Sequence, residues 1–155
     1  ERREVMDIRS KLSYPAGALT NFAPYDFEID GIKCASMEGF LQSLKTSNLF
    51  LQTEVCQLVG IEAKRWGEEH NVAWKETQKL YWRGCEYRRH GHEYQELLDR
   101  AYEALFQNED FKKALSATGQ EVLTHSIGKS DPSNTILTEE EFCSRLMKLR
   151  SKIAF

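Results

Sequence analysis

Apolar and polar residues follow two different spacings along this chain, and the change falls near Ser36. Before it, residues 26–34 alternate on either side of Asp30-Gly31, and an Asp-Gly pair between alternating runs is the strongest short signal for a β-hairpin. Turn-forming proline and glycine occur in residues 14–17 and 23–24. We therefore predict two short strands within 26–34, preceded by a loop-rich N-terminal segment.

After Ser36 the spacing becomes mostly helical, and residues 93–107 keep close to a 3.6-residue period. Ser36 is a good N-cap, and Thr138 followed by Glu141 is the signature of a capping box. A further strand is expected at 122–124. The expected helices are 37–47, 53–59, 61–69, 72–89, 93–107, a short one between Asn108 and Gly119, and a last one after Thr138. The predicted fold is mainly α with a small β-hairpin or sheet element (α+β), in a single domain over 1–155 with a core of about 9–153.

The length and net charge of the chain limit the classes of function that it can have. A chain of 155 residues can form one domain with its own core. A net charge of -3 argues against generic binding to the phosphates of nucleic acid, which needs a positive surface. It leaves open a local basic pocket for one phosphorylated ligand.

Cysteine usage and hydropathy bear on the compartment. The four cysteines contain no C-x-x-C pair, so reduced thiols are favoured over a disulfide framework or a zinc site. No apolar run approaches the roughly 18 residues of a membrane span. We expect a cytoplasmic protein (nuclear if eukaryotic) with no membrane partner, no obligate protein partner, no cofactor and no metal.

Polar residues on the first predicted helix are the first candidates for chemistry. Glu38, Gln42 and Lys45 are spaced i, i+4 and i+7, which places them on one helical face. One interpretation is a solvated polar stripe on a surface helix. The other is a stripe that faces a pocket, where a carboxylate and an amine act together. Spacing alone does not choose between these two interpretations.

Six segments of the chain resemble, in order, a known family pattern. They are 19–24 (L-T-N-F-A-P against L/F-S-N-F-x-P), 27–31 (F-E-I-D-G against F-x-L-D-G), 36–45 (S-M-E-G-F-L-Q-S-L-K against S-x-E-H-Y-F-Q-A-Q-K), 63–67 (A-K-R-W-G against A-K-R-L-G), 106–108 with 117–119 (F-Q-N and A-T-G against F-x-Q-N and A-T-G) and 146–150 (L-M-K-L-R against L-M-x-x-R). Arg9 and Trp74 match an upstream arginine and a downstream tryptophan. Over about residues 9–150 the chain is identified as similar to the NADAR (YbiA-like) family.

One segment departs from that pattern. Many members carry E-x-x-x-x-D-x-x-W-G after A-T-G, whereas this chain has T-H-S-I-G-K-S-D-P at 124–132, without Trp-Gly. The chain thus resembles a divergent branch, and Asp131 falls about one position from the family's acidic residue.

The resemblance implies cleavage of an N-glycosidic bond to ribose. Family members are associated with NAD and ADP-ribose metabolism, through removal of ADP-ribose from guanine or hydrolysis of early riboflavin-pathway intermediates. Breaking the bond builds positive charge at the anomeric carbon, which a carboxylate can stabilise. Glu38 is expected in that role or in activating water, Lys45 as a nucleophile or a phosphate contact, and Asp131 as an auxiliary.

Further residues are expected to bind a substrate such as ADP-ribosylated nucleic acid or a nucleotide. Gln42 shares the face of the catalytic pair; Arg9, Lys64 and Arg65 are candidate phosphate partners; Asn21 and Gln107 are candidates for ribose hydroxyls or base edges; Phe22 and Trp74 either stack on a base or pack the core. Two other classes remain open: a module that binds ADP-ribose or NAD without turnover, and a helical protein-interaction domain in which the Glu38 stripe faces solvent.

Overall fold

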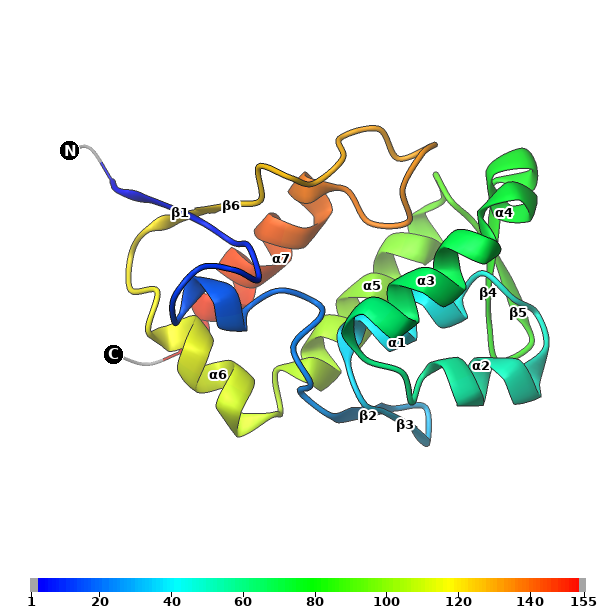
Figure 1. Cartoon of the computed structure of the whole chain (residues 1–155), viewed down its shortest axis with the longest axis horizontal. Coiled ribbons are helices and arrows are strands. Elements are labelled where there is room, and N and C mark those ends of the chain that lie inside the picture. Colours follow the sequence, from blue (N-terminus) through cyan, green and yellow to red (C-terminus); the bar gives the residue numbers. More distant parts are fainter. Residues whose placement is uncertain (1–2, 154–155) are drawn as a thin grey trace. The chain divides into compact units, whose positions relative to one another are not determined.

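A computed structural model of the chain describes residues 3–153, and within them it has seven α-helices and three two-stranded sheets (Figure 1). The predicted class, mainly α with small β elements, is confirmed. The chain divides into two compact units, residues 1–20 with 106–155 (unit 1) and residues 21–105 (unit 2). The expectation of a single domain stays a prediction, and the units are described separately.

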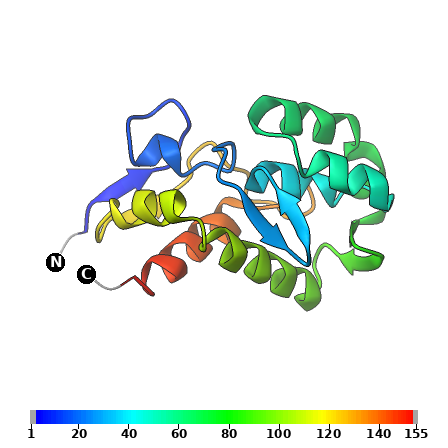
Figure 2. The same ribbon diagram turned by 90° about the horizontal axis from the view of Figure 1, so that it is seen from below.

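Unit 2 begins with the predicted hairpin. β2 (Phe27–Ile29) pairs antiparallel with β3 (Ile32–Cys34). Asp30 and Gly31 both have positive φ, 50° and 78°, as a tight two-residue hairpin turn requires. The long helix α5 (His92–Leu105) packs along β2 (Figure 2). The Asp-Gly signal was therefore read correctly.

Helix α1 (Met37–Ser43) follows the hairpin and is almost wholly buried. The Ser36 hydroxyl accepts a hydrogen bond from the Gly39 amide, which confirms the predicted N-cap. The Phe40 ring meets the Trp82 ring edge-on, with centroids 4.9 Å apart, in the core of this unit. The helix is shorter than the predicted 37–47, because tighter turns from Leu44 to Leu41 and from Lys45 to Gln42 end it.

Three further helices follow α1 in the sequence. α2 (Leu49–Val55) begins earlier than the predicted 53–59 because the Asn48 side chain caps it. α3 (Gly60–Glu69) matches the predicted 61–69, and α4 (Asn71–Thr77) follows after one residue. Both α2 and α3 pack against α1.

The predicted helix over 72–89 is wrong in its second half. α4 ends at Gln78, which has a left-handed φ of 56°, and the chain then forms the hairpin β4 (Lys79–Trp82) and β5 (Cys85–Arg88). Leu80 and Trp82 are buried and alternate with half-buried neighbours, which is a strand pattern. The turn at Arg83-Gly84, with φ values of 47° and 86°, lacks the usual Asn-Gly or Asp-Gly signal.

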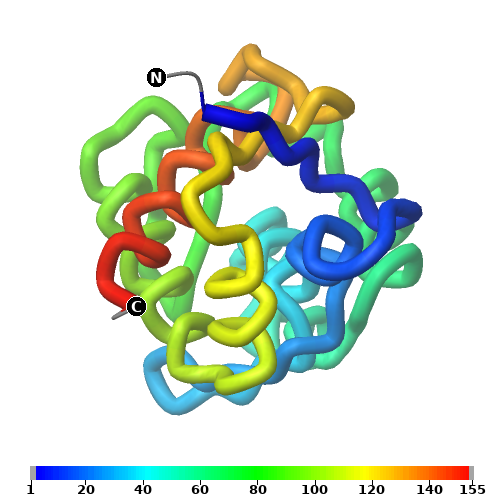
Figure 3. Tube along the Cα trace, turned by 90° about the vertical axis from the view of Figure 1, so that its left-hand side faces the viewer, coloured from blue at the N-terminus to red at the C-terminus, as the bar shows by residue number. Residues whose placement is uncertain are grey.

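Unit 1 joins two segments that lie far apart in sequence. β1 (Val5–Asp7) pairs parallel with β6 (Val122–Thr124), and the blue and yellow-to-orange parts of the tube run side by side there (Figure 3). The strand at 122–124 was predicted, but its partner was not. A 3-10 turn, η1 (Ala16–Ala18), precedes unit 2.

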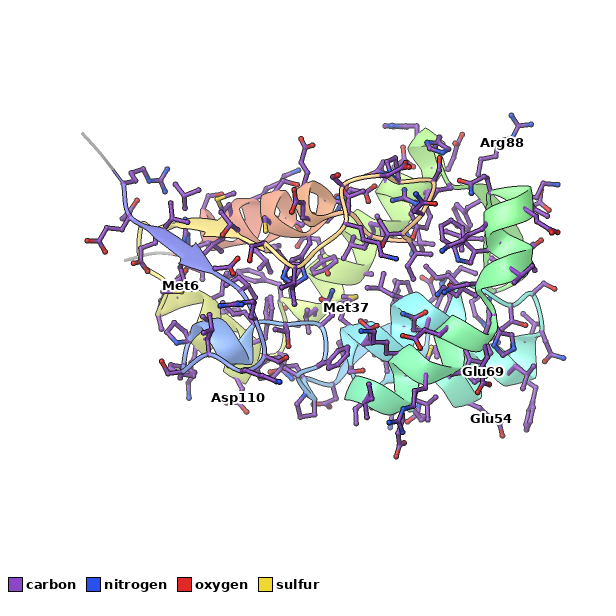
Figure 4. The ribbon with its side chains drawn as sticks, turned by 45° about the horizontal axis from the view of Figure 1, so that its top comes forward. Met6, Met37, Glu54, Glu69, Arg88 and Asp110 are labelled. Atoms are coloured by element: carbon purple, nitrogen blue, oxygen red, sulfur yellow. The ribbon has the colours of Figure 1, made fainter. Side chains whose placement is uncertain are left out.

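Helices α6 (Glu109–Ser116) and α7 (Glu139–Arg150) complete unit 1. Asn108 caps α6, and Thr138 and Glu141 form both hydrogen bonds of the capping box, so both predicted helix starts are confirmed. α7 packs against β6. Charged side chains such as Asp110 on α6, and Glu54 and Arg88 in unit 2, are exposed, whereas Met37 at the start of α1 is buried (Figure 4).

None of the helices described between residues 3 and 153 has the length and apolar character of a membrane span. The four cysteines are free, and three of them, Cys34, Cys56 and Cys143, are buried.

Candidate active site

The polar face of α1 lies against α3 at a glycine. A Cβ added to Gly67 would stand 1.8 Å from Gln42 Oε1 and 3.0 Å from Lys45 Nζ. Any side chain at this position would therefore displace them, so the missing Cβ lets the two helices approach with Gln42 and Lys45 between them. Gln42 is only 8% exposed. The interpretation of this face as a solvated stripe is wrong.

Glu38 is oriented from two directions. Its Oε1 accepts a hydrogen bond from Gln42 Nε2 at 2.8 Å, one turn further along α1. Its backbone amide donates to the Asn21 carbonyl oxygen at 3.0 Å, which ties the start of α1 to the segment before the hairpin. Glu38 is half-buried, so the residue is packed against protein groups on one side and keeps part of its surface exposed. A carboxylate in such a setting can act on a bound substrate.

Gln42 links the carboxylate to the α3 contact. Because a carboxylate only accepts hydrogen bonds, the amide nitrogen must face Glu38 and the amide oxygen must point the other way, toward Gly67. That Oε1 atom is buried and has no hydrogen-bond partner among the described residues. A buried acceptor without a donor costs about 1–3 kcal/mol, so the packing of Gln42 against Gly67 is maintained at some expense of stability.

Lys45 is held at the carboxyl end of α3. Its Nζ donates to the Gly67 carbonyl oxygen at 3.1 Å and to Asn71 Oδ1 at 2.6 Å. The last turn of a helix carries partial negative charge, which favours a positively charged side chain at this position. Trp74 Nε1 donates to the same Asn71 oxygen at 3.0 Å.

Other predicted binding residues lie in unit 2 with these groups. Asn21 contributes its backbone carbonyl to α1, while its side-chain oxygen accepts from the Tyr102 hydroxyl at 2.8 Å. Phe22 is half-buried, and one of its ring carbons lies 3.9 Å from the point where a Cβ on Gly60 would stand. Lys64 and Arg65 are exposed on α3, which turns Ala63 and Gly67 inward.

Trp74 is 2% exposed, so of its two predicted roles the structure shows core packing. A buried ring does not offer a face on which a base can stack. Its contact with the candidate site is the hydrogen bond to Asn71. The assignment of Trp74 as a direct binding residue is corrected accordingly.

Three predicted site residues belong to unit 1. Arg9 is exposed and forms an ion pair with Asp7 at 3.1 Å. Hydrogen bonds from the Ser126 side chain and backbone, aided by Thr124 and by the charge of Arg9, lower the pKa of Asp7. Arg9 thus has an acidic partner of its own within unit 1. Its role as a phosphate partner stays a prediction.

Asp131 lies in the loop before α7 and is exposed. Its two carboxylate oxygens accept from the Ser133 amide at 2.9 Å and from Asn134 Nδ2 at 3.0 Å, which closes a local turn. Gln107, exposed just before α6, completes the set. The structure gives Asp131 a local role, and its auxiliary catalytic role stays a prediction.

Asn71 is the residue that sequence reasoning missed. An asparagine between two helices reads as a cap or turn residue, and no local pattern links it to a lysine 26 positions earlier. Gly67 had been noticed only as part of a motif. No cluster of three or more His, Cys, Asp or Glu side chains suited to a metal ion occurs among residues 3–153.

Comparison with solved structures places the fold. The chain matches the NMR structure of the E. coli protein YbiA with a TM-score of 0.62 and 15% sequence identity, over 98% of this chain and 86% of YbiA. At this identity the likeness shows the fold alone. It is the fold that the NADAR resemblance implied.

Comparison of sequences places the family. Residues 13–151 match the family model described as Bacteriophage protein GP30.3. The chain is also 38% identical over 150 residues to a 17.1 kDa protein of the Gp30-rIII intergenic region of Enterobacteria phage T4, covering 96% of this chain and 98% of the phage protein. The match covers most of both chains, and the chain belongs to the GP30.3 family of bacteriophage proteins.

Proposed function

We propose that this chain is a cofactor-free N-glycosidase that hydrolyses a bond between ribose and an amine, and that it removes ADP-ribose from guanine bases. We also propose that the GP30.3 family is a divergent branch of the NADAR family. The observation that carries the proposal is the Gly67 contact, where Gln42, which orients the Glu38 carboxylate, meets the Lys45 amine, which Asn71 holds. The YbiA-like fold and the ordered motif resemblance support it.

The chemistry needs a base and a proton donor. Glu38 takes a proton from water, the water oxygen forms a bond to the anomeric carbon, and the carbon–nitrogen electron pair goes to the departing amine. That amine takes up one proton, so guanine and free ADP-ribose result. The negative charge of Glu38 also stabilises the positive charge that develops on the ribose.

Lys45 has two roles consistent with its contacts. As an ammonium it offers positive charge to a substrate phosphate or a proton to the leaving amine. As a neutral amine it attacks the anomeric carbon and displaces the guanine amine, which keeps the electron pair of the broken carbon–nitrogen bond and takes up the proton that Nζ loses. Opening of the ribose ring then gives a Schiff base, which water hydrolyses to free ADP-ribose and the amine. The second route requires a base to remove the ammonium proton, and Glu38, which is connected to the same contact through Gln42, is the candidate for it.

The test is hydrolysis of a guanine-ADP-ribosylated oligonucleotide by the wild type, Glu38→Gln and Lys45→Ala, with released ADP-ribose measured by chromatography. The wild type is expected to release ADP-ribose, and each variant to lose at least about 100-fold in rate. Glu68→Gln, an exposed carboxylate on α3, is the matched control and should keep the wild-type rate.

Other outcomes point to other functions. If no folded protein releases ADP-ribose but all bind it in calorimetry, the chain is a non-catalytic ADP-ribose-binding module. If only ribosylamino-pyrimidine phosphates of the riboflavin pathway are hydrolysed, the reaction type stands and the substrate is corrected. Equal rates for wild type and Glu38→Gln would contradict the assignment of Glu38.

A further inference from the structure

The amide of Asn71 is fixed in one orientation by two donors. Lys45 Nζ and Trp74 Nε1 both donate to Asn71 Oδ1, at 2.6 Å and 3.0 Å. Neither an ammonium nor an indole N–H can accept a hydrogen bond, so a flipped amide would set donors against donors. The oxygen of Asn71 therefore has to face Lys45. This orientation rests on the buried Trp74 ring, which is 2% exposed.

Asn71 also occupies a rigid place in the chain. It is the first residue of α4, and only His70 separates it from the end of α3. The Gly67 carbonyl, the second acceptor of Lys45, belongs to that same last turn of α3. Lys45 Nζ thus donates to two acceptors at one helix junction, the Gly67 carbonyl and the Asn71 side chain, and these bonds limit the conformations of the lysine side chain.

We propose that Asn71 is a positioning residue for Lys45: its side-chain oxygen, oriented by Trp74, holds Nζ at the Gly67 contact, beside the Gln42 side chain that binds Glu38. The consequence for the reaction rests on the proposed N-glycosidase function, whereas the geometric part does not. A lysine has four rotatable side-chain bonds and loses conformational entropy when it is ordered. The hydrogen bond to Asn71 orders the Lys45 side chain in the free protein, so this entropy is already lost before substrate binds.

Two variants of similar volume distinguish the effect of the hydrogen-bond acceptor of Asn71 from the effect of its side-chain shape. Asn71→Asp keeps an oxygen opposite Nζ, whereas Asn71→Leu keeps a similar volume and has no acceptor. Trp74→Phe keeps an aromatic ring and removes the N–H that orients the amide. Glu76→Gln, exposed on the same helix, is the control. Thermal unfolding of each variant establishes that it is folded.

The first readout is independent of any substrate. The two protons on Cε of an immobilised lysine have different chemical shifts, and those of a mobile lysine average to one value. With 13C-labelled lysine, and the Lys45 signal identified by its loss in Lys45→Ala, we expect two shifts in the wild type, Asn71→Asp and Glu76→Gln. We expect one averaged shift in Asn71→Leu. Two shifts in folded Asn71→Leu, or one in the wild type, would overturn the proposal.

The second readout is the split between kcat and KM on the oligonucleotide substrate. Loss of the acceptor should lower kcat by about 10- to 100-fold, the scale of a misplaced catalytic group, with KM changed by less than about threefold. Asn71→Asp should recover most of that rate, and Trp74→Phe should fall between them. A loss in Asn71→Asp as large as in Asn71→Leu would show that Asn71 does more than supply an acceptor and would overturn the proposal. If the wild type hydrolyses nothing while the lysine signals behave as expected, the N-glycosidase function fails and the positioning role stands.

Discussion

Gly67→Ala tests the candidate site most directly, because the added atom enters the space between α1 and α3. The new methyl carbon would lie 1.8 Å from Gln42 Oε1 and 2.3 Å from Gln42 Cδ. Ordinary contact between such atoms needs well over 3 Å, so Gln42 must move by at least about 1.2 Å. This movement breaks or bends its hydrogen bond to Glu38 and crowds Lys45 Nζ, 3.0 Å from the same point.

The effect on stability should be modest because two terms oppose each other. Alanine within a helix is more stable than glycine by about 1 kcal/mol. Overpacking a buried position costs about 1–3 kcal/mol, and here the atoms that must yield are the end of one flexible side chain. We therefore expect a net loss of about 0–2 kcal/mol in the free energy of unfolding, measured by urea denaturation.

The effect on activity should be much larger. A displacement of about 1 Å at a catalytic group costs on the order of 100-fold in rate, so Gly67→Ala should lose about that in kcat on the ADP-ribosylated oligonucleotide. Gly39→Ala gives the contrast, since its Cβ would meet the backbone oxygens of Leu58 and Val55 at 2.5 Å and 2.9 Å and should mainly destabilise the fold. A folded Gly67→Ala protein within twofold of the wild-type rate would refute the placement of the active site at this contact.

Three further predictions concern the fold. Thr138→Ala removes the capping box of α7 and should cost about 1 kcal/mol in urea unfolding, whereas Ser144→Ala on the exposed side of α7 should change it little. Gly84→Ala meets no atom within 4 Å but strains a φ of +86°, so it should destabilise by about 1 kcal/mol; an unchanged unfolding midpoint would contradict the turn. Hydrogen bonds from Ser126 lower the pKa of Asp7 in the folded state, so the ionised carboxylate stabilises the protein above about pH 4, and this stabilisation is lost as the pH falls through the folded pKa. Asp7→Asn should therefore reduce the loss of stability on acidification, measured as the free energy of unfolding against pH. An unchanged pH dependence would exclude Asp7 as a contributor.

The features that sequence predicted well are those whose cause is local. The Asp30-Gly31 turn and the Thr138–Glu141 capping box each depend on residues within four positions of one another. The helix pattern of 93–107 is also local, because its period reports directly on one buried face.

The failures come from longer range or from weaker turn chemistry. β1 and β6 pair across more than 110 residues, and nothing in either segment identifies the other. The β4–β5 hairpin was taken for helix because Arg83-Gly84 is a weak turn signal, although the spacing of the buried Leu80 and Trp82 is that of a strand. The same distinction between local and long-range causes applies to the candidate site. Helical spacing was enough to select Glu38, Gln42 and Lys45. It could not identify Asn71 or the Gly67 contact, which depend on how α1 packs against its neighbours.

The two acidic candidates differ in what holds their oxygens, and this difference predicts unequal roles. A Glu38 oxygen accepts from Gln42, whose own position depends on the packed α1–α3 contact. Both oxygens of Asp131 accept hydrogen bonds within its own exposed loop, from Ser133 and Asn134. A carboxylate whose two oxygens close a local turn is less free to turn toward a bound substrate, so Asp131→Asn should cost less than about tenfold in rate where Glu38→Gln costs at least about 100-fold. A larger loss for Asp131→Asn than for Glu38→Gln, in proteins of equal stability, would reverse the assignment and make Asp131 the principal carboxylate.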